Sequence, residues 1–233
     1  GPRLRAIQRV GAGVDTIDVR AASAAGIPVF NTSGVNAITV AELTIGLALS
    51  AARQIPRWDV AVRDGDFDKR NQEPGIQLHG KTWGIVGLGN IGQTVARIAG
   101  PGLGMSVLAY HPRRSTGWIE SRGAIPAESL NECLASSDVV SVHVPLTDST
   151  RNLLGREEFR RMRERSILVN MARGGVIDEA ALAEALSKGP LSAAGVDVFV
   201  DEPPAPDNPL LALPNVVLSP HRGGRTREAT EEQ

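Results

Sequence analysis

Four polar side chains stand where short apolar runs of the sequence end, each run being typical of a strand. They are Arg173, Asp197, Glu202 and His221. In an open parallel sheet, ligands bind beyond the carboxyl ends of the strands. We therefore expect these four groups, far apart in the sequence, to converge at one edge of a sheet. Together they would supply one cation, one imidazole and two carboxylates.

A glycine-rich turn follows another strand candidate. Residues 87–92 read GLGNIG and fit the pattern G-x-G-x-x-G between a strand and a helix. Gly87 allows a tight turn, Gly89 lets the backbone approach a pyrophosphate, and Gly92 lets the helix pack close to the strand. Free N–H groups at the start of the helix attract phosphates. The turn, with Asn90 and Ile91, predicts a dinucleotide site; the alternative is a tight turn without a ligand.

A basic turn follows the next strand, where a site that prefers NAD carries a carboxylate for the ribose hydroxyls. This chain has His111 at that place, followed by Arg113 and Arg114. Guanidinium groups match the charge of the 2'-phosphate of NADP. The turn therefore favours NADP over NAD. The alternative is a solvated basic turn, because arginines are common on surfaces.

These groups suit hydride transfer between a nicotinamide and a 2-oxo acid. Arg173 would hold the substrate carboxylate, and His221 would donate a proton to the carbonyl oxygen as charge develops there. Glu202 beside the imidazole would favour its protonated form and orient it, and Asp197 would hold the nicotinamide amide. Structural roles are also open: an ion pair for Arg173, a turn cap for Asp197, and an ordinary polar position for His221.

The elements that must position these residues alternate between β-branched runs and amphipathic stretches. This alternation predicts an α/β fold with a doubly wound parallel sheet covered on both faces. A typical helix runs from Asp178, a candidate N-cap, to Lys188, with Gly189 ending it in a left-handed conformation. The six expected strands are Thr82–Val86, Ser106–Tyr110, Val139–Val144, Ile167–Asn170, Ala194–Val198 and Val216–Leu218.

The first eighty residues differ from the rest, with two strand candidates, Leu4–Val10 and Pro28–Asn31, and a helix from about Thr39 to Arg53. One strand pair and one helix are too few elements for a complete domain. We therefore expect the sequence to begin inside a domain.

Composition sets the broad class of protein. With 42% apolar residues and a net charge of -1, the chain can bury a core and has no bias toward nucleic acid. Cys133 is the only cysteine, which excludes an internal disulfide, argues against a thiolate metal cluster, and suits a reducing cytoplasm. The longest uncharged apolar run, residues 43–52, is about half of the roughly 20 residues that a membrane span needs. We expect a cytoplasmic protein with no metal site and no membrane or nucleic-acid partner.

Taken together, the sequence resembles the D-isomer-specific 2-hydroxyacid dehydrogenases, which include phosphoglycerate dehydrogenases and glyoxylate/hydroxypyruvate reductases. The likeness covers nearly the whole chain. It is carried by VGAGVD (10–15), NTSGVN (31–36), VAEL (40–43), GLGNIG (87–92), HVPL (143–146), VNMARGGVID (169–178), GVDVFVDEP (195–203) and SPHRG (219–223).

This resemblance implies that Arg173, Glu202 and His221 are the catalytic residues, in agreement with the chemistry above. It places Ala12 and Gly13 at the substrate carboxylate, near Arg173 and His221. It also implies cofactor contacts from Val144, Pro145, Met171, Ala172, Asp197 and Gly223.

The resemblance further implies a Rossmann-type NAD(P)-binding domain over residues 37–220, including an interdomain helix. Residues 1–36 would be a remnant of a flavodoxin-like substrate domain, and residues 221–233 would begin the return to it. Family members have a longer substrate domain, so we expect both ends to be cut here. The family usually dimerises through its nucleotide-binding domain, which favours a homodimer.

We expect a reductase of a short 2-oxo acid such as glyoxylate or hydroxypyruvate, acting with NADPH in preference to NADH. D-3-phosphoglycerate dehydrogenase is the alternative, because residues 31–43 resemble that subgroup. Relatives that oxidise formate carry an amide where this chain has Glu202, which argues against that activity. A non-catalytic dinucleotide-sensing corepressor of the same fold stays open, because the presence of the catalytic residues does not exclude it.

Overall fold

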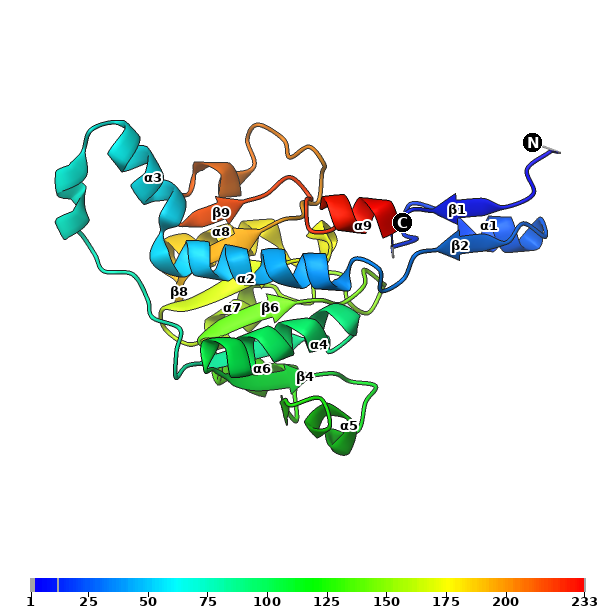
Figure 1. Cartoon of the computed structure of the whole chain (residues 1–233), viewed down its shortest axis with the longest axis horizontal. Coiled ribbons are helices and arrows are strands. Elements are labelled where there is room, and N and C mark those ends of the chain that lie inside the picture. Colours follow the sequence, from blue (N-terminus) through cyan, green and yellow to red (C-terminus); the bar gives the residue numbers. More distant parts are fainter. Residues whose placement is uncertain (1–2, 12, 233) are drawn as a thin grey trace.

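The main body of the protein is a parallel sheet of seven strands in the order β5-β4-β3-β6-β7-β8-β9. The computed structural model describes residues 3–11 and 13–232, and Figure 1 shows the arrangement of its elements. All neighbours in this sheet run parallel, so their carboxyl ends share one edge. The strands are β3 (Thr82–Val86), β4 (Ser106–Tyr110), β5 (Ile125–Pro126), β6 (Val139–Val142), β7 (Ser166–Asn170), β8 (Leu191–Val196) and β9 (Val216–Leu218).

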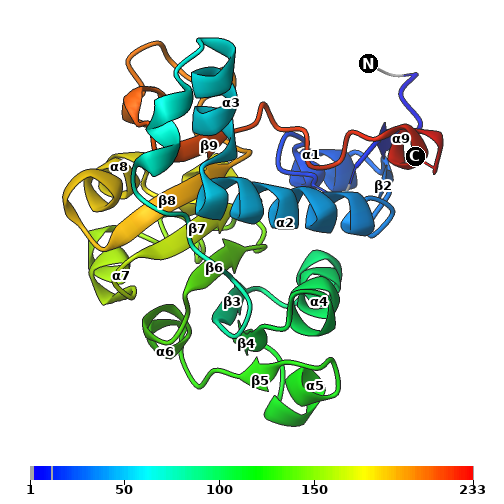
Figure 2. The same cartoon turned by 60° about the vertical axis from the view of Figure 1, so that its left-hand side comes forward.

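Helices cover both faces of the sheet, as the predicted doubly wound fold requires (Figure 2). One face packs against α2 (Ala37–Arg53) and α4 (Asn90–Arg97), which continues into the π-helical turn η2 (Ile98–Gly102). The other face is covered by α6 (Leu130–Ala135), α7 (Arg156–Arg161) and α8 (Glu179–Lys188), with the 3-10 helix η4 (Pro209–Ala212). The smaller elements are α5 (Thr116–Glu120), η3 (Gly174–Val176) and α9 (Arg227–Glu232).

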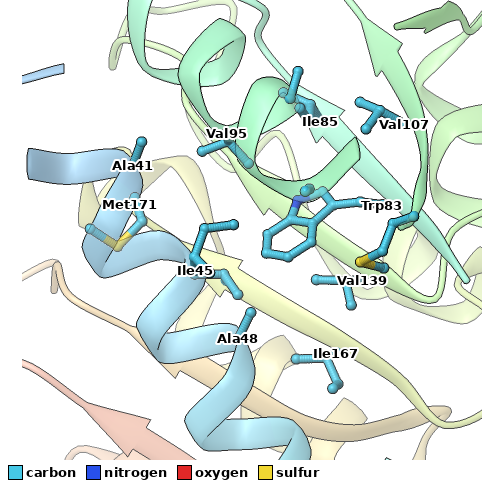
Figure 3. Packing of buried hydrophobic residues seen from close by; sticks show 14 of the residues in the cluster. Ala41, Ile45, Ala48, Trp83, Ile85, Val95, Val107, Val139, Ile167 and Met171 are labelled. Carbon is cyan, nitrogen blue, oxygen red and sulfur yellow. The ribbon is translucent and has the colours of Figure 1, made fainter. Parts of the chain in front are cut away.

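The core on the α2 face is built around Trp83, whose side chain is fully buried. Figure 3 shows Ala41, Ile45 and Ala48 of α2 facing this indole and the neighbouring strands. The Trp83 Nε1 donates to Ser141 Oγ at 2.9 Å, which satisfies a polar atom inside the core. Small residues on α2 let the helix lie close to the sheet. This packing fixes the position of α2, which links the first two strands to the main body.

A second, two-stranded parallel sheet precedes α2. It pairs β1 (Ile7–Arg9) with β2 (Val29–Asn31), and α1 (Val19–Ala24) lies between them in the sequence. After α2 the chain forms α3 (Ile55–Arg63) and the 3-10 helix η1 (Phe67–Asn71), which project from the main body (Figure 1). No single described helix is long and apolar enough to cross a membrane, although α2 and α3 together pass by length and composition with a bend of 61° between them.

The structure confirms the α/β class and corrects several details. Six strands were expected, and the seventh, β5, is an edge strand of two residues, too short to show a pattern. β6 ends at Val142, and β8 begins at Leu191 rather than Ala194. The helices α1 and α3 were not expected.

The ends of α8 test a prediction about caps. Asp178 does cap the helix, because its Oδ1 accepts from Ala181 N at 3.0 Å. The expected left-handed conformation of Gly189 is wrong, since its φ of -107° and ψ of -161° are extended. A Cβ at Gly189 would lie 2.8 Å from Ala185 Cα, so this glycine permits close packing instead.

Two adjacent leucines in η4 provide a matched test of the core. Leu210 is 0% exposed and belongs to the cluster on the α8 face, whereas Leu211 is 41% exposed. We expect Leu210→Ala to lower the free energy of unfolding by about 2–5 kcal/mol, because it removes buried methyl groups and leaves a cavity. Leu211→Ala is expected to cost less than about 1 kcal/mol. Urea unfolding measures both, and equal losses would contradict the packing described here.

Candidate active site

The glycine turn lies between β3 and α4, as predicted, and its three glycines have different surroundings. Gly87 has a φ of +98°, and a Cβ there would lie 2.8 Å from Val144 Cγ1. A Cβ at Gly92 would lie 2.4 Å from Gly87 O, so this glycine lets the helix start against the strand. A Cβ at Gly89 would meet nothing within 4 Å among the described residues. The turn therefore leaves open space at Gly89, the position where a pyrophosphate would approach the backbone.

The start of α4 carries backbone N–H groups that no described side chain caps. Such groups attract anions. Asn90 begins the helix, and its Nδ2 would lie 2.9 Å from a Cβ at Gly34, which belongs to the segment between β2 and α2. Ile91 is partly buried and packs against the core. The turn is thus accessible at Gly89 and is held in place by the packing of Ile91 against the core. This arrangement fits the binding of a dinucleotide phosphate.

Arg173 extends from the end of β7 toward the first segment of the chain. Its Nε donates to Asp15 Oδ1 and Oδ2 at 3.2 and 3.3 Å, and its Nη1 donates to Ala172 O at 2.8 Å. A Cβ at Gly13 would lie only 1.8 Å from Arg173 Nη2, so a larger residue there would displace the guanidinium. The structure thus brings together two residues that were expected to meet a substrate carboxylate. Arg173 also has the carboxylate partner considered as the alternative.

His221 and Glu202 form a pair at the ends of β8 and β9. His221 Nδ1 lies 2.7 Å from Glu202 Oε2 and 3.0 Å from Oε1. Phe199 N donates to Glu202 Oε1 at 3.2 Å, which holds the carboxylate in place. Both side chains are exposed, so the imidazole is accessible to a ligand. Because Nδ1 faces the carboxylate, Nε2 is the nitrogen left for a reacting group.

Asp197 holds the turn that carries His221. Its carboxylate, in a residue only 1% exposed, accepts from Arg222 N and Gly223 N, each at 2.8 Å, and its carbonyl accepts from His221 N at 2.7 Å. The role of turn cap, considered as an alternative, is therefore present. The predicted contact of Asp197 with a nicotinamide amide stays a prediction.

The remaining expected cofactor residues surround this turn or the glycine turn. A Cβ at Gly223 would lie 3.0 Å from both Asp197 Oδ2 and Met171 Cε, which places these three residues together. Ala172 is buried beside Met171. Val144 lies next to Gly87, and the exposed Pro145 follows it. Ala12, the remaining expected substrate residue, lies outside the described residues.

The basic turn follows β4 at the same edge of the sheet. His111 Nδ1 accepts from Arg113 N at 3.3 Å. Burial lowers the pKa of His111, and the positive charges of Arg114 and Arg113 lower it further. The positive charge of the turn therefore comes from the arginines. Arg114 lies over the ring of Trp118, with its Cζ 4.7 Å from the ring centroid.

Sequence reasoning did not assign roles to Asp15 or Trp118. Asp15 stands 158 positions before Arg173, and no local pattern reports such a contact. Trp118 lies in a helix of five residues, too short to show helical periodicity. The signal for Asp15 was its place in VGAGVD, and the signal for Trp118 was an aromatic residue shortly after a basic turn.

The chain belongs to the D-isomer specific 2-hydroxyacid dehydrogenases, since the sequence pattern of the NAD binding domain of that family matches residues 45–223. It is 47% identical over 227 residues to D-3-phosphoglycerate dehydrogenase of Methanocaldococcus jannaschii, covering 97% of this chain and 43% of that protein. It is 45% identical to hydroxypyruvate reductase of Thermotoga maritima, covering 98% of this chain and 74% of that protein. The chain thus spans less than half the length of the first relative.

A solved structure shares the fold at high similarity. The NADPH-dependent glyoxylate/hydroxypyruvate reductase of Sinorhizobium meliloti, determined with NADP and malonate, superposes with a TM-score of 0.88 at 33% identity. The alignment covers 98% of this chain and 70% of that one. The family and the Rossmann-type fold expected from the sequence are confirmed.

The glycine turn yields a test that separates ligand binding from folding. Gly89→Ala should leave the free energy of unfolding within about 1 kcal/mol of the original, because its Cβ meets open space. It should weaken NAD(P)H binding by about tenfold or more, because the methyl group occupies the path of the pyrophosphate. Gly92→Ala should instead cost about 1–3 kcal/mol of stability. Urea unfolding and calorimetric titration measure the two effects; unchanged affinity in Gly89→Ala would contradict the phosphate site.

His143, in the HVPL segment after β6, has a strongly lowered pKa. Burial lowers its pKa from 6.5 to about 3, and Nδ1 is a buried atom with no hydrogen-bond partner among the described residues. Its Nε2 lies 3.0 Å from Ser141 Oγ. The folded imidazole therefore stays neutral at pH values where an unfolded one takes up a proton.

We accordingly expect His143 to destabilise the fold as pH falls from about 6.5 toward about 3. In that window the unfolded chain binds more protons at this residue, so the free energy of unfolding decreases on acidification. His143→Gln keeps a polar group for Ser141 and cannot titrate. Urea unfolding at several pH values should show a shallower loss in the variant. The same pH dependence in both proteins would contradict a neutral buried His143.

Proposed function

We propose that the protein reduces a short 2-oxo acid, such as glyoxylate or hydroxypyruvate, to the D-2-hydroxy acid, with NADPH preferred to NADH. The observation that carries the proposal is the His221–Glu202 pair, 2.7 Å apart, at the same sheet edge as Arg173. A fixed cation and a proton donor are what carbonyl reduction in a 2-oxo acid requires. The reverse oxidation uses the same groups.

In this proposal Arg173 binds the substrate carboxylate. Its Nε and Nη1 are already directed to Asp15 and Ala172, which orients the guanidinium, while Nη2 lies against Gly13. The absence of a side chain at Gly13 leaves room for that group. Ion pairing between a guanidinium and a carboxylate is strong and directional. Arg173 would therefore fix both the position and the orientation of the oxo acid.

His221 donates the proton to the carbonyl oxygen. Glu202 accepts from Nδ1, orients the ring, and leaves Nε2 to face the substrate. The turn held by Asp197 sets the position of the His221 backbone, which has a φ of +52°. The glycine turn, Val144, Pro145, Met171, Ala172, Asp197 and Gly223 would hold the cofactor, which supplies the hydride to the carbonyl carbon.

The preference for NADPH is supported by the end of β4. His111 stands where a carboxylate would bind the ribose hydroxyls of NAD, and Arg113 and Arg114 follow it. The reductase of Sinorhizobium meliloti, of similar fold, is described as NADPH-dependent. The family shown is named for NAD binding, so the preference for the phosphorylated cofactor is part of the proposal.

Oxidation of D-3-phosphoglycerate is the second candidate, favoured by the 47% identity with the dehydrogenase of Methanocaldococcus jannaschii. The two candidates share Arg173, Glu202 and His221 and differ in what binds the far end of the substrate. We favour the reductase because the basic turn fits NADP.

The proposal includes a homodimer and a cytoplasmic location. The arm formed by α3 and η1 projects from the main body (Figure 1). Its apolar residues Ile55, Val60, Val62 and Phe67 are exposed. Apolar side chains gathered on a projection suit burial against a second copy.

A single free cysteine, buried, suits a reducing compartment. The division into residues 1–36, 37–220 and 221–233 also belongs to the proposal.

The role of His221 is tested by His221→Asn in the intact enzyme. Asparagine tolerates the positive φ at this position and cannot donate a proton as an imidazolium does. We expect turnover of the 2-oxo acid to fall by about 10²- to 10⁴-fold, with NADPH affinity nearly unchanged. Steady-state kinetics and calorimetric titration measure the two quantities. Turnover equal to that of the original protein would remove His221 from the mechanism.

A further inference from the structure

Trp118, on the short helix α5, gathers positive groups from two parts of the chain. The Cζ atoms of Arg114 and Arg122 lie over its ring, 4.7 and 3.8 Å from the centroid. The ring of His111 meets it edge to face, with centroids 6.0 Å apart. A tryptophan ring attracts guanidinium groups through its electron-rich face. Trp118 is therefore the centre of a basic cluster, defined here as Arg113, Arg114, Trp118 and Arg122.

Backbone contacts fix this cluster. Ser115 is the N-cap of α5, and its Oγ accepts from Trp118 N at 3.4 Å. Arg122 Nη1 donates to Trp118 O at 3.1 Å and to Ser121 Oγ at 2.7 Å, so its guanidinium is held at the end of the same helix. The Nε of Arg122 is a buried atom with no hydrogen-bond partner in the described part of the chain. One member of the cluster thus has a buried N–H donor that is unused among the described residues.

No carboxylate of the described residues forms an ion pair with the cluster. Within residues 3–11 and 13–232, none of Arg113, Arg114 and Arg122 forms an ion pair with a carboxylate. The pKa of His111 is lowered, first by burial and then by the charges of Arg114 and Arg113, so the arginines carry the charge. Arg113 and Arg114 directly follow β4, at the edge where the ribose of a dinucleotide lies, and Arg122 reaches the Trp118 ring from the far end of α5. Three unpaired guanidinium groups at this place suit a doubly charged anion.

We propose that Trp118 and Arg122 are specificity-determining residues: Trp118 holds Arg114 and Arg122 in position for the 2'-phosphate of NADP. This inference rests on the proposed cofactor preference and adds two residues to it. A free arginine side chain loses rotamer freedom when it binds a phosphate. Stacking on the indole restricts the guanidinium beforehand, so less freedom is lost on binding. Discrimination between phosphorylated and unphosphorylated ligands therefore depends on the ring.

The test uses calorimetric titration of the whole protein with adenosine 2',5'-bisphosphate and with adenosine 5'-monophosphate. The dissociation constant of the monophosphate, divided by that of the bisphosphate, reports on the 2'-phosphate alone. Trp118→Leu keeps apolar volume and removes the aromatic face, whereas Trp118→Phe keeps a ring. We expect the ratio to fall by about 5- to 30-fold in Trp118→Leu and to stay within about 3-fold in Trp118→Phe. Affinity for the monophosphate should be unchanged in both.

Arg122→Gln is a second variant that leaves the ring in place, and it tests the proposal if Trp118→Leu fails to fold. It should lower the ratio by about 10-fold. Arg160→Gln, on the far face of the sheet, is the matched control and should not change the ratio.

Two failures are distinguishable in this experiment. If the original protein binds both ligands equally, the NADPH preference and this inference are both wrong. If the original protein prefers the bisphosphate and Trp118→Leu and Arg122→Gln keep that preference, Arg113 and Arg114 suffice and this inference alone is overturned.

Discussion

Parallel pairing of β3, β6, β7, β8 and β9 is the constraint on which the site depends. Because these strands run in one direction, each delivers the residues that follow it to the same edge. The glycine turn follows β3, Arg173 follows β7, and Asp197 and His221 follow β8 and β9. No single loop could collect these groups. The buried core, centred on Trp83 and closed by α2 (Figure 3), fixes the register that aligns the strand ends.

Two contacts position the side chains of His221 and Arg173 at this edge. The buried Asp197 carboxylate binds the backbone after His221 and sets the imidazole against Glu202. The ion pair between Arg173 and Asp15 joins the main sheet to the segment that follows β1. A substrate carboxylate at Arg173 would therefore lie between the two sheets.

The sequence predicted those features that local chain properties determine. Six of the seven main strands were found because buried parallel strands are continuous apolar runs. The glycine turn was found because three glycines stand at the spacing G-x-G-x-x-G between a strand and a helix, and two of them, Gly87 and Gly92, leave no room for a Cβ. The meeting of Arg173, Glu202 and His221 at one edge was predicted because polar residues that follow parallel strands share that edge.

What the sequence did not reveal has physical reasons. β5 and α5 have two and five residues, which are too few for a period to appear. The pairing of Asp15 with Arg173 and the gathering of Arg114 and Arg122 at Trp118 are tertiary contacts, and no local pattern encodes them. Gly189 matched a common helix end, but close contact with Ala185 determined its conformation.

The central claim is that this edge of the sheet transfers hydride and does not merely bind a dinucleotide. The most direct measurement supplies NADPH carrying deuterium at the transferable position of the nicotinamide, with glyoxylate and hydroxypyruvate in turn. The account predicts deuterium at C2 of the hydroxy acid, and the D configuration when hydroxypyruvate is reduced to glycerate. Tight NADPH binding without deuterium in either product would contradict it and favour a dinucleotide sensor.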